Sequence, residues 1–356
     1  MVSSRRLARE WALKILYQAD VGKMPVDEAL TAALERLRRE FVQRASQVAN
    51  GSLIEEYFVD AITGYLAASV PHYTAPVEAA LRGCFAQIFD ASDFWAGLQV
   101  TFTFSRNSYE ALWQTPNGSD ALDLPSDRAA LPPTARLSDG LTTADRTRLA
   151  DFLAWAQQGL PDAGMRAFAN EARRGRPQGA KMRETHEYVV QRWKGFTASM
   201  SERWPRAGAA VEKHACDWLR VAAFAHELVK GVEEHGAELD AMLRSVEIGW
   251  ALDRQVSVDR NVLRMAAFEL SHLPAIPASV TINEAVELAK KYSTAESGKF
   301  VNGILGAIAA RMPERFAPVG PGGAELLPEA PIAGPDAELD EQTGDETPWV
   351  ECSTLP

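Results

Sequence analysis

Residues 258–312 read VDRNVLRMAAFELSHLPAIPASVTINEAVELAKKYSTAESGKFVNGILGAIAARM, and they carry the most informative pattern in the chain. Apolar residues in its first part recur at spacings of three and four, which predicts an amphipathic helix. They are Val262, Leu263, Ala266, Leu270 and Leu273. Asp259 is the expected N-cap of this helix, because its carboxylate can accept a hydrogen bond from a backbone N–H. Pro274 and Pro277 are expected to end it.

Two further helices are predicted in the same stretch. Thr281 and Glu284 lie three residues apart, which predicts a capping box at the start of the second helix. Its apolar side comprises Ile282, Ala285, Val286, Ala289 and Tyr292. Ser293 and Thr294 offer a break before a third helix, whose apolar residues are Phe300, Val301, Ile304, Leu305 and Ile308. Three consecutive amphipathic helices predict a small helical bundle.

The N-terminal residues predict another helix over 4–20, with a wide apolar face that includes Trp11 and Ile15. A second helical pattern follows Pro25. Further helices are expected over 212–228 and 237–250.

Helical periodicity predicts only a bundle, whereas particular phrases of the sequence also indicate a family. The phrases INEAVELAK (282–290) and KFVNG (299–303), together with RRLAREWAL (5–13) near the N-terminus, resemble the NusB family of bacterial transcription antitermination factors. The two matches occur at opposite ends of the chain and in the family's order. The resemblance implies an all-α fold, a NusB-like helical bundle of two helical subdomains.

The chain is much longer than that bundle requires, so we predict four parts. Residues 1–41 are the N-terminal NusB-like helices, 42–208 are a mostly helical insertion, and 209–312 are the NusB-like helical bundle. The insertion should contain helices over 52–69, 76–90, 142–157 and 183–204, and one strand over 99–104. Residues 313–356 are rich in Pro, Gly and acidic residues and predict a disordered tail.

The net charge of −11 would seem to oppose nucleic-acid binding, but the charge is unevenly distributed. Residues 313–356 hold ten acidic residues and one Arg, a net of −9, which leaves −2 for residues 1–312. Basic patches are therefore possible on the body of the protein. No apolar run is long enough to span a membrane, so we expect a soluble, cytoplasmic protein without membrane contact.

Two groups of residues are candidates for RNA binding. Arg5, Arg6, Arg9 and Tyr17 lie on or beside one stripe of the first helix, where guanidinium groups could pair with phosphates and the phenol ring could stack on a base. A solvated helix face is the alternative explanation of this stripe.

The second group follows from the resemblance. Tyr292, Glu296, Lys299 and Phe300 match positions on the RNA-binding surface of the NusB family, with Glu296 where the family usually has Asp. Phe300 could instead belong to the core. Together the two groups require the first and last helices to fold against each other.

Signatures of enzymes are missing from the sequence. His226-Glu227 begins like a zinc-protease helix, but Lys230 stands where the second histidine would be needed. The six His residues do not cluster along the sequence, and the three Cys residues have no metal-binding spacing. We therefore expect a non-catalytic protein without cofactor or metal.

The resemblance implies a function in transcription antitermination. The expected partners are single-stranded, boxA-like leader RNA of ribosomal RNA transcripts, the ribosomal protein NusE and the transcription elongation complex. Two alternatives stay open. NusB-like domains also occur in a family of RNA cytosine methyltransferases, which would make this chain a module of an RNA-modification enzyme. The chain could also be a ribosome-assembly scaffold that acts through its insertion.

Overall fold

The structure is a computed structural model that describes residues 4–49, 56–89, 99–104, 109–114, 140–156, 168, 182–246, 255–294 and 296–312. The predicted acidic tail, 313–356, lies outside these residues. No helix in the described ranges is sufficiently long and apolar to cross a membrane.

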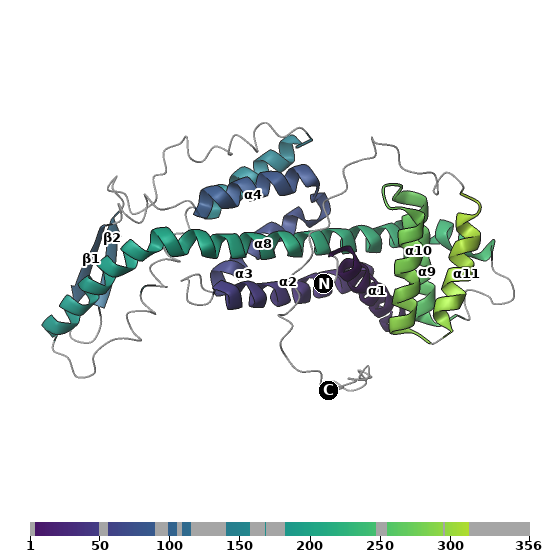
Figure 1. The fold of residues 1–356 in the computed structure, drawn as a ribbon, viewed down its shortest axis with the longest axis horizontal. Coiled ribbons are helices and arrows are strands. Elements are labelled where there is room, and N and C mark those ends of the chain that lie inside the picture. Colours follow the sequence, from purple (N-terminus) through teal and green to yellow (C-terminus); the bar gives the residue numbers. More distant parts are fainter. Residues whose placement is uncertain are drawn as a thin grey trace.

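One very long helix, α8 (Met182–Arg244), runs through the molecule and organises the other elements (Figure 1). Its middle part packs against α1 (Ser4–Gly22), α2 (Val26–Ala49) and α4 (Ala75–Phe89). The 3₁₀ helix η1 (Ala67–His72) and α3 (Glu56–Leu66) also contact it. As a result, every residue of α8 from 214 to 222 is buried, as expected of a helix that is surrounded by others.

The C-terminal helices form a compact group at one end of α8 (Figure 1). They are α9 (Ser257–His272), α10 (Ala278–Tyr292) and α11 (Ser297–Ala309). α9 is the central member, because it packs against α1, α8, α10 and α11. The three helices predicted within residues 258–312 are therefore confirmed.

The predicted strand also exists. β1 (Gln99–Phe104) pairs antiparallel with β2 (Tyr109–Gln114), with Gln99 opposite Gln114 and Phe104 opposite Tyr109. This hairpin lies beside the first part of α8, at the end of the molecule away from α9–α11 (Figure 1). A helix over 143–156 agrees with the prediction for 142–157. The fold is thus an all-α bundle with a mostly helical inserted region, as the sequence predicted.

The predicted insertion is not set apart by loops. Its expected limits, at 41/42 and 208/209, fall within the continuous helices α2 and α8. Buried residues of α3, α4 and helix 143–156 belong to the same hydrophobic core as those of α1 and α9–α11. The inserted helices therefore enlarge one core instead of building a second one.

A buried ion pair fixes α4 of this region to α8. Glu78 accepts hydrogen bonds from both the Nε and the Nη2 of Arg220, and the Nε bond is 2.9 Å long. Asp217 accepts a further bond from Arg220 at 2.9 Å. Hydrogen bonds from Arg220 hold the pKa of Glu78 below its usual value in spite of burial, which raises it. The pairing offsets the cost of burying these charges.

Two predicted helix caps are wrong, because both sets of side chains make tertiary contacts. Asp259 lies inside the first turn of α9, is buried, and accepts a hydrogen bond from Ser297 Oγ at 2.8 Å. α10 begins before the predicted capping box, at Ala278. Thr281 instead donates to Glu269 at 3.0 Å, and Glu284 binds Arg6. Local capping signals in this stretch thus mark contacts between helices.

Gly231 of α8 lies directly against the side chain of Phe268 on α9. A Cβ atom at this position would lie 2.0 Å from Cζ of Phe268, far inside van der Waals contact. Gly303, in the phrase KFVNG, has by contrast nothing within 4 Å of an added Cβ. Glycine is therefore required at position 231, where α8 crosses α9.

The first helix is anchored to α9 by a buried pair. Arg9 Nε and Nη2 donate to the two carboxylate oxygens of Glu269 at 2.7 and 2.8 Å. The side chains are 4% and 1% exposed. The Arg9 guanidinium also lies 5.3 Å from the ring centre of Phe224 on α8. Three helices distant in sequence thus meet at Arg9.

Gly231→Ala is expected to destabilise the protein by about 1–3 kcal/mol, because Phe268 must leave its position to admit the methyl group. Gly236→Ala, in the same helix but with nothing near its added Cβ, is the matched control. It should be neutral or stabilise by up to about 1 kcal/mol. Urea unfolding monitored by circular dichroism measures both, and equal effects would contradict the close crossing.

Arg9→Met is expected to cost about 3 kcal/mol of unfolding free energy, because it leaves the Glu269 carboxylate buried without its partner. Adding Glu269→Leu removes that charge and should restore more than half of the loss. Urea unfolding of the single and double variants tests this expectation. A double variant less stable than Arg9→Met alone would show that the pair is not the source of the effect.

Candidate RNA-binding surface

Side-chain pairs connect α1 to α10 in a regular order. Arg6 donates two hydrogen bonds to Glu284, at 2.9 and 2.5 Å. One turn later on α1, Glu10 accepts bonds from Lys291 Nζ at 2.9 Å and from the Tyr292 hydroxyl at 2.8 Å. The partners advance together along both helices, so α1 and α10 run in the same direction.

The contacts of α1 with α9 advance in the opposite sense. Arg9 pairs with Glu269 near the end of α9, whereas Asp20 accepts from Arg260 near its beginning at 2.5 Å. α1 is therefore antiparallel to α9 and is held on two sides by polar contacts. The N-terminal helix therefore packs against α9 and is linked to α10 by side chains, which brings the N-terminal and C-terminal segments together.

The structure separates the predicted residues of α1 into different environments. Arg9 is buried in its ion pair and does not reach the surface. Arg6 pairs with Glu284 but keeps a side chain that is 41% exposed. Tyr17 is half-buried farther along the helix. Arg5 is half-buried and lies with its guanidinium 5.7 Å from the ring centre of Phe224, on the α8 side of α1.

The predicted C-terminal residues surround the break between α10 and α11. Glu296 and Lys299 are highly exposed, 78% and 82%, and form a loose pair at 3.3 Å. Tyr292 and Phe300 are half-buried and pack against the core. Phe300 thus serves the core with part of its ring, and this alternative was foreseen.

The break itself is fixed by Ser297. Its Oγ accepts from the backbone N–H of Thr294 at 3.2 Å and donates to Asp259 at 2.8 Å. Glu296 and Lys299 flank this buried serine along the chain. The exposed pair therefore lies beside a helix break that Ser297 ties to α9 by a hydrogen bond to Asp259.

Two cations that the sequence analysis left out belong to the same surface. Lys290 and Lys291 end α10, and each side chain is 57% exposed. The signal for them was the sequence AKKY (289–292), in which both lysines directly precede Tyr292.

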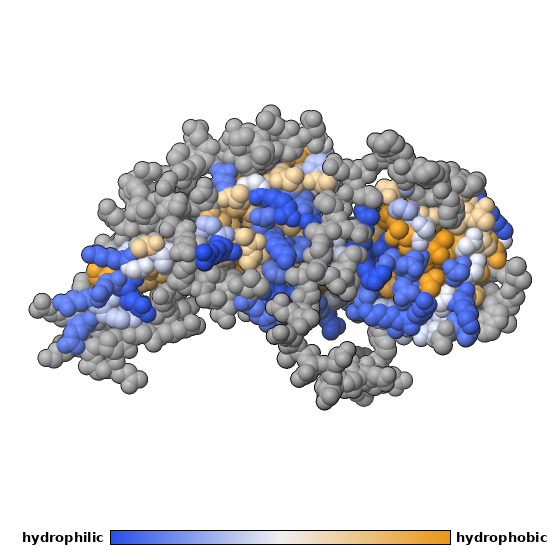
Figure 2. Space-filling model, viewed as in Figure 1, coloured by the Kyte–Doolittle hydropathy of each residue, from blue (hydrophilic) through white to orange (hydrophobic). Residues whose placement is uncertain are grey.

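Figure 2 shows that hydrophilic residues cover much of the described surface, whereas hydrophobic residues also reach it over the C-terminal helices.

Ion pairing shapes the electrostatics at this surface. The hydrogen bonds from Arg6 lower the pKa of Glu284, and the carboxylate raises the pKa of Arg6 in turn. Burial, together with the hydrogen bond to Glu10, raises the pKa of the Tyr292 hydroxyl. The phenol is thus a neutral hydrogen-bond donor that fixes the ring in place.

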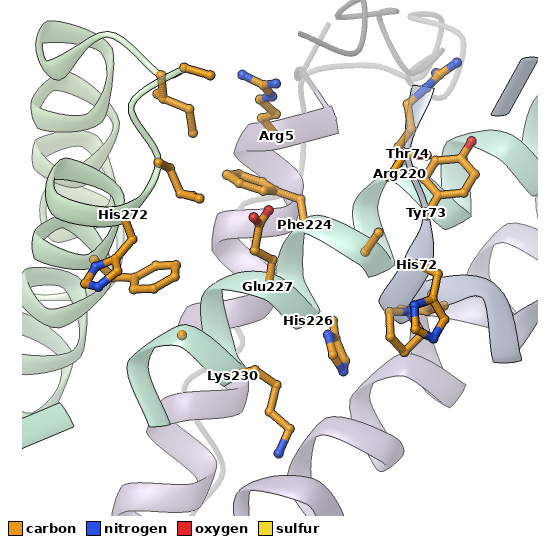
Figure 3. Close-up of a pocket in the computed structure, with 18 of the residues that line it drawn as sticks. Arg5, His72, Tyr73, Thr74, Arg220, Phe224, His226, Glu227, Lys230 and His272 are labelled. Atoms are coloured by element: carbon orange, nitrogen blue, oxygen red, sulfur yellow. The ribbon is translucent and has the colours of Figure 1, made fainter. Parts of the chain in front are cut away.

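A cavity of about 590 Å³ lies on the other side of α1, between α8, η1 and the segment after α9. Arg5, Glu227, Lys230, His226 and His272 are among its lining residues (Figure 3). Burial raises the pKa of Glu227, which Arg5 opposes. Arg5 therefore lines the cavity, whereas Arg6 pairs with Glu284 of α10.

The described cysteines are poor nucleophiles. Cys84 and Cys216 are buried, and burial raises the pKa of each thiol to about 12. Thiols of this kind stay protonated at neutral pH and do not react readily. The interactions described around α1 and α10 are ion pairs and ring contacts, which are typical of binding surfaces.

Glu284→Gln is expected to lower stability at neutral pH by about 1 kcal/mol, a value that allows for the solvent exposure of Arg6. Because the folded-state pKa of Glu284 lies below 4.5, its contribution is present above pH 4.5 and is lost as the pH falls through the folded value. Urea unfolding of wild type and variant between neutral pH and about pH 3 should therefore converge in acid.

Glu287→Gln is the matched control, since Glu287 is an exposed acid on the same helix that pairs with Lys290. It should change stability little at any pH. A difference between wild type and Glu284→Gln that persists in acid would contradict the assignment to the ion pair.

Comparison with known proteins identifies relatives of part of this chain. Residues 211–310 match the NusB family. The transcription antitermination protein NusB of Myxococcus xanthus is 42% identical over 116 residues, which cover 33% of this chain and 83% of the relative. The protein of the same name from Bacillus velezensis is 46% identical over 99 residues, 28% of this chain and 75% of the relative.

Among solved structures, T. maritima NusB is 32% identical, with 42% of this chain and 87% of that chain covered and a TM-score of 0.25. The sequence relatives carry the family assignment, because they are matched over most of their own length. The chain belongs to the NusB family.

Proposed function

We propose that this chain is a non-catalytic, RNA-binding transcription antitermination factor. It would bind boxA-type leader RNA of ribosomal RNA transcripts together with the ribosomal protein NusE, in the cytoplasm, and act on the elongation complex. The observation that carries the proposal is the fixed pairing of α1 with α10 through Arg6–Glu284 and Glu10–Tyr292. This pairing presents exposed cations from both ends of the chain.

The RNA would contact Arg6 and the lysines near the α10–α11 break. Arg6 retains an exposed edge beyond its bond to Glu284, and Lys299 is almost entirely exposed. Cations of this kind neutralise phosphates, and the exposed parts of the Tyr292 and Phe300 rings could stack on unpaired bases. Tyr17 and Glu296 would complete the surface. Arg9 would act indirectly, by holding α1 against α9.

Arg5 has a separate part in the proposal. It lines the cavity beside α8 and lies near Glu227. A strand of RNA that follows Arg6 would pass to Arg5 only around the N-terminal end of α1. Arg5 would then contact the RNA at the edge of the surface.

Wild-type protein should shift a labelled, single-stranded boxA-type RNA in a native gel, and NusE should strengthen the shift. The logarithm of the affinity should fall with the logarithm of the salt concentration at a slope of about −2 to −3, which corresponds to three or four phosphate contacts. Lys299→Glu should weaken binding about tenfold near 0.1 M salt and make the slope shallower.

Arg39→Glu is the matched control, because Arg39 is an exposed cation on α2, which packs against α1, α3 and α8. It should bind RNA like the wild type. If Lys299→Glu binds RNA as tightly as the wild type, or if both variants lose the same affinity, the proposed surface is not the RNA-binding site. Binding of NusE without any binding of RNA would favour the scaffold function instead.

A further inference from the structure

Two histidines that are 37 positions apart in the sequence meet where α8 crosses α9. The ring centres of His235 and His272 are 4.0 Å apart, with an angle of 41° between the rings. Glu238, one turn after His235 on α8, places its carboxylate 3.3 Å from Nδ1 of His235. One ligand atom from each of the three side chains lies within 4.8 Å of the others. We propose that His235, Glu238 and His272 bind a divalent transition-metal ion of the Zn²⁺ type.

The donor set suits such an ion. Two imidazoles and one carboxylate are ligands that Zn²⁺ takes in tetrahedral sites, with the fourth position left to water or another ligand. Bonds of about 2.0–2.2 Å in a tetrahedron hold the ligand atoms about 3.3 Å apart. His235 Nδ1 and Glu238 Oε2 already have this separation. The ion would replace the hydrogen shared between them.

The hydrogen bonds of His272 leave its other nitrogen for the metal. Ser271 Oγ donates to the backbone carbonyl of Ala267 at 2.7 Å, so it accepts from Nδ1–H of His272 at 2.8 Å. A neutral imidazole protonated at Nδ1 carries its lone pair on Nε2. Contacts of this kind fix the tautomer and orientation of histidine ligands in metal sites.

The helix crossing preorganises the ligands. Phe268 fills the space opposite Gly231 and stacks on His272 at 4.9 Å between ring centres. The Phe268 ring centre is also 5.9 Å from that of His235. One aromatic ring therefore supports both imidazoles. Both histidines are also lining residues of the cavity, where Figure 3 labels His272.

Solvent can reach the site. The side chain of His235 is 36% exposed and that of Glu238 is 58% exposed. An ion can therefore enter without unfolding, and the exposed fourth position would stay open to an exchangeable ligand. Bound metal would join α8 to α9 at the base of the C-terminal bundle. This inference is independent of RNA binding.

The test is titration of the purified full-length chain with Zn²⁺ alone, followed by calorimetry, and with Co²⁺ alone, followed by visible absorption. One ion should bind per chain, and the Co²⁺ spectrum should show the strong bands of tetrahedral coordination. His235→Gln, His272→Gln and Glu238→Gln should each weaken binding by more than about tenfold, and Ser271→Ala by about tenfold. Zn²⁺ should raise the Tm of the wild type and not that of His272→Gln.

His226→Gln is the matched control, because His226 lies on α8 and lines the same cavity but does not belong to the three-residue cluster. It should bind both ions like the wild type. If a histidine variant fails to fold, Glu238→Gln decides the matter, since this exposed side chain is remote from the core. Absence of stoichiometric binding, or an equal loss in His226→Gln, would overturn the proposal.

Discussion

The arrangement of the NusB-like bundle depends on the buried pair between Arg9 and Glu269. A carboxylate that is removed from water needs strong partners, and Glu269 obtains them from Arg9 on α1 and from Thr281 on α10. Glu269 itself lies on α9, so the three side chains come from three helices, and the charges are satisfied only when α1, α9 and α10 are all in place. The electrostatic requirement thus fixes the packing of the N-terminal helix on the C-terminal group.

The large inserted region is compatible with this bundle because α8 carries both. The C-terminal part of α8 crosses α9 at Gly231, while its middle part supports α4 through Arg220 and Glu78. The insertion adds helices along the same spine and extends one hydrophobic core. It therefore leaves the contacts between α1 and α9–α10 intact.

Arg5 and Arg6 of α1 serve different faces because successive side chains of a helix point about 100° apart, whereas Arg5 and Arg9, four residues apart, both lie near Phe224. Arg5 lies by the cavity at α8, Arg6 reaches α10, and Arg9 is enclosed between α8 and α9. Arg5 lines the same cavity as His235 and His272, whereas the other residues proposed to contact RNA do not line it. Substitutions at Lys299 and at His272 therefore test the two proposals separately.

Apolar spacing and the phrases INEAVELAK and KFVNG are local properties, so they were enough to predict the family and the three C-terminal helices. The separate helices predicted over 183–204, 212–228 and 237–250 are instead the single helix α8, Met182–Arg244. The two groups of candidate residues also led us to expect that the N-terminal helix meets the C-terminal helices, and α1 packs against α9. Only the tertiary structure decided what the polar residues do. Thr281 and Glu284 have the spacing of a cap but bind other helices, Arg9 has the spacing of a surface stripe but is buried, and His235 meets His272 from another helix. Periodicity distinguishes apolar from polar faces, whereas the partner of a polar side chain depends on which helices pack around it.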